Sequence, residues 1–119
     1  MINYAHRFHG HASLSYVHRN GAILRAQGLN LKYVNNPKRT TYRAAVIVSK
    51  KVHKSAVVRN RIRRRMYEII RLYADETKSI DFVLQIFDEK TATVAADELL
   101  RSIVGLFKKA QIINNNPGV

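Results

Sequence analysis

The chain has 119 residues, 46% of them hydrophobic, and no cysteine, which fits one domain with a modest core and excludes disulfide or thiolate chemistry. Its formal net charge is +13, but residues 1–67 hold 15 Lys and Arg without one acid, whereas residues 68–119 hold six bases and eight acids. This distribution favours a polyanionic partner and disfavours a nuclease whose own clustered carboxylates hold metal ions.

The first half of the chain predicts a helix followed by strands. We expect residues 1–10 to form a flexible arm and residues 13–19 a short helix. Residues 22–34 predict one strand or a pair of short strands, because apolar and polar side chains alternate there. Residues 40–49 predict a further strand, which we place centrally in a sheet because its run at 44–48 is apolar on both faces.

The second half predicts helix, strand and helix. A basic helix is expected over residues 56–74, and a β-branched and aromatic strand over residues 80–87, where Asp81 is the acid most suited to a buried role. A last helix is expected to be capped by Thr91 or Thr93 and to end near Ala110. The tail from residue 112 to 119 is expected to fray.

This order, α-β-β-β-α-β-α, predicts an α+β fold. We expect a two-layer sandwich in which a central four-stranded mixed sheet packs against helices, forming one domain over residues 1–119. No apolar run approaches a membrane span, and the N-terminus lacks the apolar core of a secretory signal. We therefore expect a cytoplasmic protein with no membrane partner.

The basic helix is the most informative segment. Nine of the 22 residues from Lys50 to Arg71 are Lys or Arg, and Glu68 is the one acid among them. Apolar residues recur at steps of three and four along one face of this helix: Val58, Ile62, Met66, Ile69 and Tyr73. Ser55 is placed to cap the helix through its hydroxyl. On that spacing, Tyr67 points away from the apolar stripe. Like charges four residues apart repel in an isolated helix, so their crowding favours neutralisation by phosphates.

Other chemistries fit the sequence less well. The five glycines form no phosphate loop, and no carboxylate or nucleophile constellation indicates an enzyme acting alone. A strand precedes the basic helix, which argues against a helix-turn-helix reader of DNA. His6, His9 and His11 lack a further acidic or thiol ligand nearby, so a metal site there is disfavoured.

RNA is the favoured polyanion, because a cationic helix on a sheet can dock on irregular phosphate surfaces while exposed aromatics stack on unpaired bases. Four tyrosines are candidates for such stacking, although packing in the core is the alternative for each: Tyr16, Tyr33, Tyr42 and Tyr67.

The run from Ala56 to Arg64, Ala-Val-Val-Arg-Asn-Arg-Ile-Arg-Arg, resembles the protein subunit of bacterial ribonuclease P. That family is marked by an Arg-Asn-Arg helix followed by a basic pair. Val48-Ser49-Lys50-Lys51 and Asp81-Phe82-Val83 also resemble its pattern, and the element order agrees along nearly the whole chain. The resemblance implies an unusual left-handed crossover between parallel strands.

The resemblance further implies a ribonucleoprotein endonuclease in which a catalytic RNA with bound Mg²⁺ removes the 5′ leader of precursor tRNA. No catalytic residue, no metal ligand and no obligate protein partner is then expected on this chain. The family's RNA-binding positions are matched by Lys50, Lys51, Lys54, Arg59, Asn60, Arg61, Arg63 and Arg64, with Arg65 as a further candidate. Its leader-binding cleft corresponds to Leu14, Tyr16, His18, Lys32 and Tyr33.

Four positions depart from the family pattern. Tyr67 stands where a further arginine is usual, and Arg65 or Arg71 is the candidate to compensate. Leu14 and His18 replace aromatics of the first helix. Ala45 replaces a glycine that the family has in its central strand. A structural RNA-binding protein of the ribosomal type, without a processing role, is the alternative function.

Overall fold

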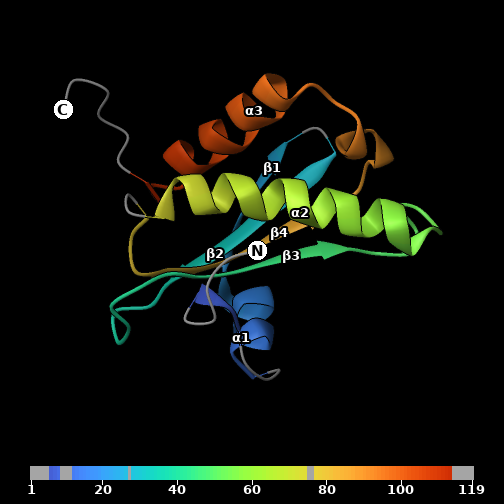
Figure 1. The fold of residues 1–119 in the computed structure, drawn as a ribbon. Helices are drawn as coiled ribbons and strands as arrows, with labels where there is room; N and C mark the ends of the chain where they lie inside the picture. Colours follow the sequence, from blue (N-terminus) through green and yellow to red (C-terminus); the bar gives the residue numbers. More distant parts are fainter. Residues whose placement is uncertain (1–5, 9–11, 27, 75–76, 114–119) are drawn as a thin grey trace.

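The computed structural model describes residues 6–8, 12–26, 28–74 and 77–113. The predicted order of elements is confirmed. It comprises α1 (Ala12–Asn20), β1 (Ala22–Ala26), β2 (Leu29–Asn35), β3 (Arg43–Val48), α2 (Ala56–Leu72), β4 (Ile80–Ile86), the 3₁₀ turn η3 (Glu89–Ala92) and α3 (Ala96–Lys109). Helices α2 and α3 cover one face of the sheet, and α1 lies on the other (Figure 1).

The four strands form one mixed sheet in the order β1-β2-β4-β3. Strands β1 and β2 are an antiparallel hairpin that turns at Gly28, whose φ of 79° suits glycine. Strand β4 pairs antiparallel with β2 and parallel with β3. The central position is therefore held by β4, and the prediction that residues 40–49 form a central strand is wrong.

The burial of the two strands explains that error. In β3, Ala44, Val46 and Val48 are buried, while the alternate positions are half-buried. In β4 the residues from Ile80 to Leu84 are all buried, as expected of a strand covered on both sides. The sequence of β3 is also rich in small and β-branched apolar residues, but only one of its two faces is fully buried.

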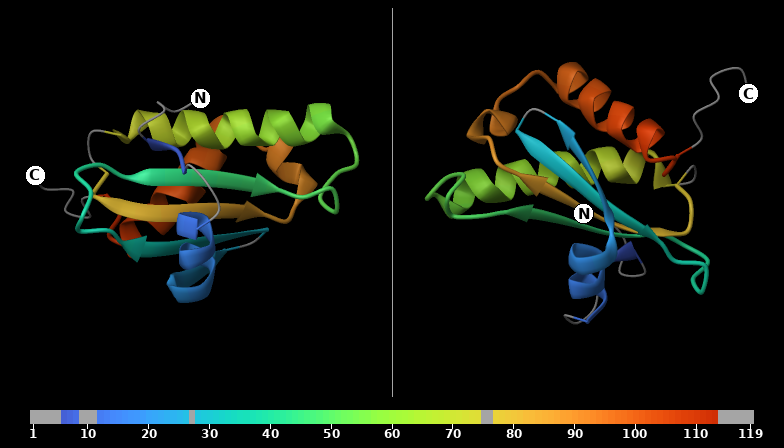
Figure 2. Two further views of the ribbon diagram at one scale, coloured as in Figure 1. Left: turned by 90° about the horizontal axis from the view of Figure 1, so that it is seen from below. Right: turned by 180° about the vertical axis from the view of Figure 1, so that it is seen from behind.

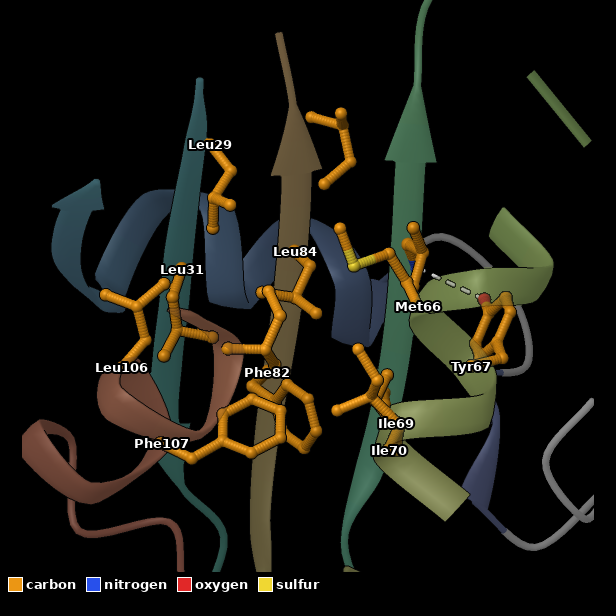
Figure 3. Packing of buried hydrophobic residues seen from close by; sticks show 14 of the residues in the cluster. Leu29, Leu31, Met66, Tyr67, Ile69, Ile70, Phe82, Leu84, Leu106 and Phe107 are labelled. Carbon is orange, nitrogen blue, oxygen red and sulfur yellow. Dashed lines mark hydrogen bonds between the residues drawn. The ribbon is translucent and has the colours of Figure 1, made fainter. Parts of the chain in front are cut away.

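The chain passes from β3 through α2 to β4, its parallel neighbour. Seen with the strand arrows upward and α2 in front, β4 lies to the left of β3 (Figure 3). A right-handed connection would move to the right, so this crossover has the rare left-handed sense. The expectation from the family resemblance is thus met.

The main core lies between the sheet and the pair α2 and α3. Phe82 and Leu84 of β4 meet Met66, Ile69 and Ile70 of α2 and Leu106 and Phe107 of α3 (Figure 3). Phe82 and Phe107 pack edge to face, with ring centroids 5.3 Å apart. This core fixes α2 by its apolar side, which leaves its charged side toward solvent. None of the helices in the described part of the chain combines the length and apolar character that a membrane crossing requires.

Residues 6–8 and 112–113 pack on the domain, although the sequence predicts a flexible arm and a frayed tail there. The His6 ring stacks on Tyr42 with centroids 4.1 Å apart, and Arg7 forms a parallel bridge to Ala44. Residues 6–8 therefore pack along β3. At the other end Ile112 and Ile113 are buried, so the frayed tail does not begin at residue 112. The remaining parts of the expected arm and tail, with His9 and His11, lie outside the described residues.

The last helix begins later than predicted. Asp88 accepts a hydrogen bond from the Lys90 backbone N–H and caps η3, in which Thr91 is buried. Helix α3 then starts at Ala96 with Ala95 at its N-cap position, so neither Thr91 nor Thr93 caps it. One side of α3 and its C-cap residue are buried against the core, through Leu99, Ile103, Leu106, Phe107 and Ala110.

Candidate RNA interface

Helix α2 begins where the sequence predicts but is capped differently. Ser55 occupies the N-cap position, yet its hydroxyl makes no capping bond. Its backbone N–H donates instead to His53 Nδ1 at 3.0 Å. Arg59 stiffens this start, because its Nη1 donates to the carbonyl oxygens of His53 and Lys54 at 2.8 and 2.9 Å. The positive end of the helix dipole adds to the charge at this end.

Most predicted RNA-binding residues lie on one exposed surface, which we call the α2 cationic face. Its exposed members are Lys50, Lys51, Lys54, Asn60, Arg61 and Arg64, and Arg59 and Arg63 are half-buried beside them. The Nη2 group of Arg63 donates to Asn60 Oδ1, which aligns the two side chains on adjacent turns. The segment 49–55 and the first half of α2 thus present their cations together.

No ion pair of the described residues neutralises the arginines of this face. Within the described residues, the ion pairs are Arg43–Asp81, His53–Glu89, Arg71–Glu68 and Arg101–Asp97. None of them involves an arginine between residues 59 and 65. Glu68, the one acid of α2, accepts from Arg71 at 2.7 Å, and this bond lowers the pKa of Glu68. The cations of the α2 cationic face therefore remain available to an external anion.

Arg65 has a different environment. Its Nη1 donates to the Thr91 carbonyl at 2.7 Å, and its Nη2 donates to the Val94 carbonyl. The guanidinium therefore ties α2 to η3 and the segment after it. The sequence includes Arg65 among the RNA-binding candidates, but the structure gives it an internal, positioning role.

Tyr67 points inward, contrary to the helical-wheel prediction. It is 9% exposed, and its hydroxyl accepts a hydrogen bond from the Val46 backbone N–H at 3.1 Å (Figure 3). Strand β3 lies at the end of the sheet, so this N–H would otherwise have no strand partner. The phenol that replaces the usual family arginine thus satisfies a backbone donor at the sheet edge.

The second candidate surface is the face of the sheet that carries α1. Residues that are paired across neighbouring strands lie on the same face of the sheet. Lys32, Val83 and Ala45 therefore form one row across β2, β4 and β3. Helix α1 crosses only part of this face (Figure 2). Beside α1 lies a cleft of about 360 Å³, to whose walls Tyr16 and Lys38 contribute. A strand of nucleic acid can therefore approach the sheet next to α1.

The leader-binding candidates do not all lie on that surface. Leu14 and His18 are half-buried one helical turn apart, and Tyr16 is 52% exposed. Lys32 Nζ lies 3.4 Å from His18 Nδ1, and burial, followed by the charge of Lys32, lowers the pKa of His18 below 6.5. Tyr33 is registered with Phe82 and packs against the main core, so it faces the opposite side of the sheet from Lys32.

A buried ion pair fixes α1 on this face. Arg43 Nη2 and Nε donate to the two Asp81 carboxylate oxygens at 2.6 and 3.0 Å, and Nη1 donates to Ser13 Oγ at 3.3 Å. Asn36 Nδ2 donates to the same carboxylate at 3.0 Å. The Arg43 guanidinium also lies 5.1 Å from the centroid of the Phe8 ring. The expected buried role of Asp81 is confirmed, and Arg43 is its partner.

Among the described residues, no three His, Asp or Glu side chains are grouped as a metal site would require. Of the carboxylates exposed in the described residues, Asp97 pairs with Arg101 and Glu89 lies 4.0 Å from His53. Hard cations such as Mg²⁺ prefer oxygen ligands, which the phosphates of a nucleic acid supply. The described residues therefore offer no grouped ligands for such a cation.

The fold and the two surfaces define a small basic α+β protein of the RNA-binding class. The family model for ribonuclease P matches residues 2–111, and the chain belongs to that family. The ribonuclease P protein component of a Synechococcus strain is 35% identical over 81 residues, covering 56% of this chain and 62% of the relative. The match thus spans less than two thirds of that relative's length.

Solved structures agree with this assignment at the level of the fold. A Staphylococcus aureus ribonuclease P protein superposes with a TM-score of 0.81 at 20% identity, covering 92% of this chain and 98% of that one. The Thermotoga maritima protein gives 0.76 at 19% identity, covering 87% and 96%. The strand order and the helix order are therefore those of ribonuclease P proteins.

Proposed function

We propose that this chain is the protein component of a ribonuclease P ribonucleoprotein, in which it binds the catalytic RNA and the 5′ leader of precursor tRNA. The observation that carries the proposal is the α2 cationic face, whose arginines pair with no carboxylate in the described residues. A charged surface of this kind gains affinity by releasing counterions from phosphates. The matched Arg-Asn-Arg segment lies at the centre of that surface.

The catalytic RNA is proposed to dock on the α2 cationic face. Lys54, Arg61 and Arg64 are exposed there and contact phosphates, while Arg59 and Arg63 hold the helix start and Asn60 in place. Because the helix backbone is already ordered, RNA binding costs the ordering of these side chains but no ordering of the backbone. The protein then acts as a fixed multivalent counterion for a folded RNA.

The 5′ leader is proposed to lie on the face of the sheet beside α1. Lys32 and His18 supply polar contacts, and Tyr16 supplies an exposed ring for stacking on an unpaired base. Tyr33 is left out of this set, because it packs on the other face of the sheet. Leader and catalytic RNA would thus contact opposite sides of the β3–α2–β4 unit.

Mg²⁺ is proposed to be bound mainly by the RNA, where it would supply the Lewis-acid chemistry for hydrolysis of the phosphodiester. The chain's own part is electrostatic. By screening two crowded RNAs, its cations allow both the substrate and Mg²⁺ to bind more tightly. No side chain of this protein is assigned to the bond cleavage.

The proposal is tested by adding the protein to ribonuclease P RNA and precursor tRNA at low Mg²⁺ concentration. We expect leader removal to accelerate, and the acceleration to fall as Mg²⁺ is raised to a level at which the RNA acts alone. RNA binding without any acceleration at low Mg²⁺ would contradict the processing role. That outcome would favour the alternative of a structural RNA-binding protein.

A further inference from the structure

The α2 cationic face is not uniformly charged, because it contains a hollow with partly apolar walls. The hollow has a volume of about 500 Å³ and is lined by Val57, Asn60, Arg63, Arg64 and Tyr67. Volumes of this size are typical of small-ligand sites. It lies along the outer side of α2, where four of these five residues are on successive turns.

Val57 and Tyr67 are the residues of the hollow that can offer apolar surface. Val57 is 75% exposed, the highest value among the large apolar residues exposed in the described chain. Tyr67 is held from behind by the hydrogen bond between its hydroxyl and the Val46 N–H. The hollow therefore has a fixed wall with apolar surface. A site that bound only phosphates would need cations and hydrogen-bond donors, but no such wall.

The polar groups of the hollow can orient a bound ligand. Asn60 Oδ1 already accepts from Arg63 Nη2, so the Asn60 amide nitrogen is the group left to donate into the hollow. Arg64 is exposed at the rim and makes no hydrogen bond or ion pair with the described residues. The site therefore combines an apolar wall, an amide donor and a cation.

We propose that the hollow binds one unpaired nucleotide of the RNA partner, with the base against Val57 and Tyr67 and its phosphate on Arg64. The Asn60 amide donates to an acceptor atom of that base. This inference rests on the proposed function, since it assigns a base contact within the same RNA interface. A nucleotide has the apolar ring, the acceptor atoms and the anion that these walls match.

The first test measures equilibrium affinity for ribonuclease P RNA at several salt concentrations. We expect Val57→Ser to weaken binding about 3- to 10-fold with an unchanged salt slope, because a base contact releases no counterion. Arg64→Ala should weaken binding and lower the slope by about one. Leu72→Ser is the matched control, since Leu72 is an apolar residue of α2, 64% exposed, that lies outside the hollow.

The second test detects the base directly. RNA carrying 4-thiouridine is cross-linked to the protein by light, and the adducts are located by mass spectrometry. We expect adducts within the peptide that contains residues 57–67. Equal affinities for Val57→Ser and Leu72→Ser, together with no adduct there, would overturn the inference. If the wild-type protein binds this RNA normally in that case, the proposed function stands and only the base contact is lost.

Discussion

Neutralising Asp81 should strongly destabilise the fold, because Asp81 and Arg43 form a buried pair. Their side chains are 5% and 15% exposed, and two N–H groups of Arg43 donate to the carboxylate at 2.6 and 3.0 Å. At an effective dielectric constant of about 20, two unit charges about 4 Å apart attract by about 4 kcal/mol. Asp81→Asn removes this attraction but keeps one acceptor oxygen.

We therefore expect Asp81→Asn to lower the free energy of unfolding by about 3 kcal/mol, at the lower end of the range for breaking a buried pair. For a domain of this size the melting temperature should fall on the order of 10 °C. Urea denaturation and calorimetry measure both quantities. Asp97→Asn is the control, because Asp97 and Arg101 are 76% and 73% exposed, and it should cost less than about 1 kcal/mol. Equal losses for the two variants would refute the reasoning.

Three further variants test separate contacts. Tyr67→Phe should cost about 1–3 kcal/mol by leaving the Val46 N–H without a partner, and a melting temperature equal to wild type would exclude this role. Arg65→Gln should lower stability while the salt slope of RNA binding stays unchanged; a smaller slope would mean that Arg65 contacts phosphate. Lys32→Gln should raise the pKa of His18 in an NMR titration, since the Lys32 charge helps to lower it. In the wild type, unfolded His18 takes its proton first as pH falls below 6.5, so the contribution of His18 to stability decreases there, and a constant contribution would contradict the shift.

The sequence predicts the order of elements and the position of the basic helix because both depend on local periodicity. The stripe of Ile62, Met66 and Ile69 is buried as predicted, and α2 begins at Ala56 as expected. The unbalanced charge of α2 also survives in the fold, since in the described residues no acid pairs with an arginine between residues 59 and 65. Local pattern and composition were sufficient for these features.

Features that depend on distant contacts were not predicted. Tyr67 lies at the margin of the helical stripe, and its inward orientation depends on the Val46 N–H, 21 residues earlier in the chain. The central place of β4 depends on which strands pair, and β3 has a similar apolar run. Tyr33 was grouped with Lys32 although neighbouring strand residues point to opposite faces, a signal that the sequence did contain.

The central claim is that RNA binds the cations of α2 rather than basic residues in general. It is tested most directly by comparing two variants with the same loss of charge, Arg61→Gln/Arg64→Gln and Lys78→Gln/Lys109→Gln, all at exposed positions. Affinity for ribonuclease P RNA is measured from low to high salt. We expect the first variant to lose at least about tenfold in affinity and about two units of salt slope, and the second to bind like wild type. Equal losses in the two variants would contradict the account.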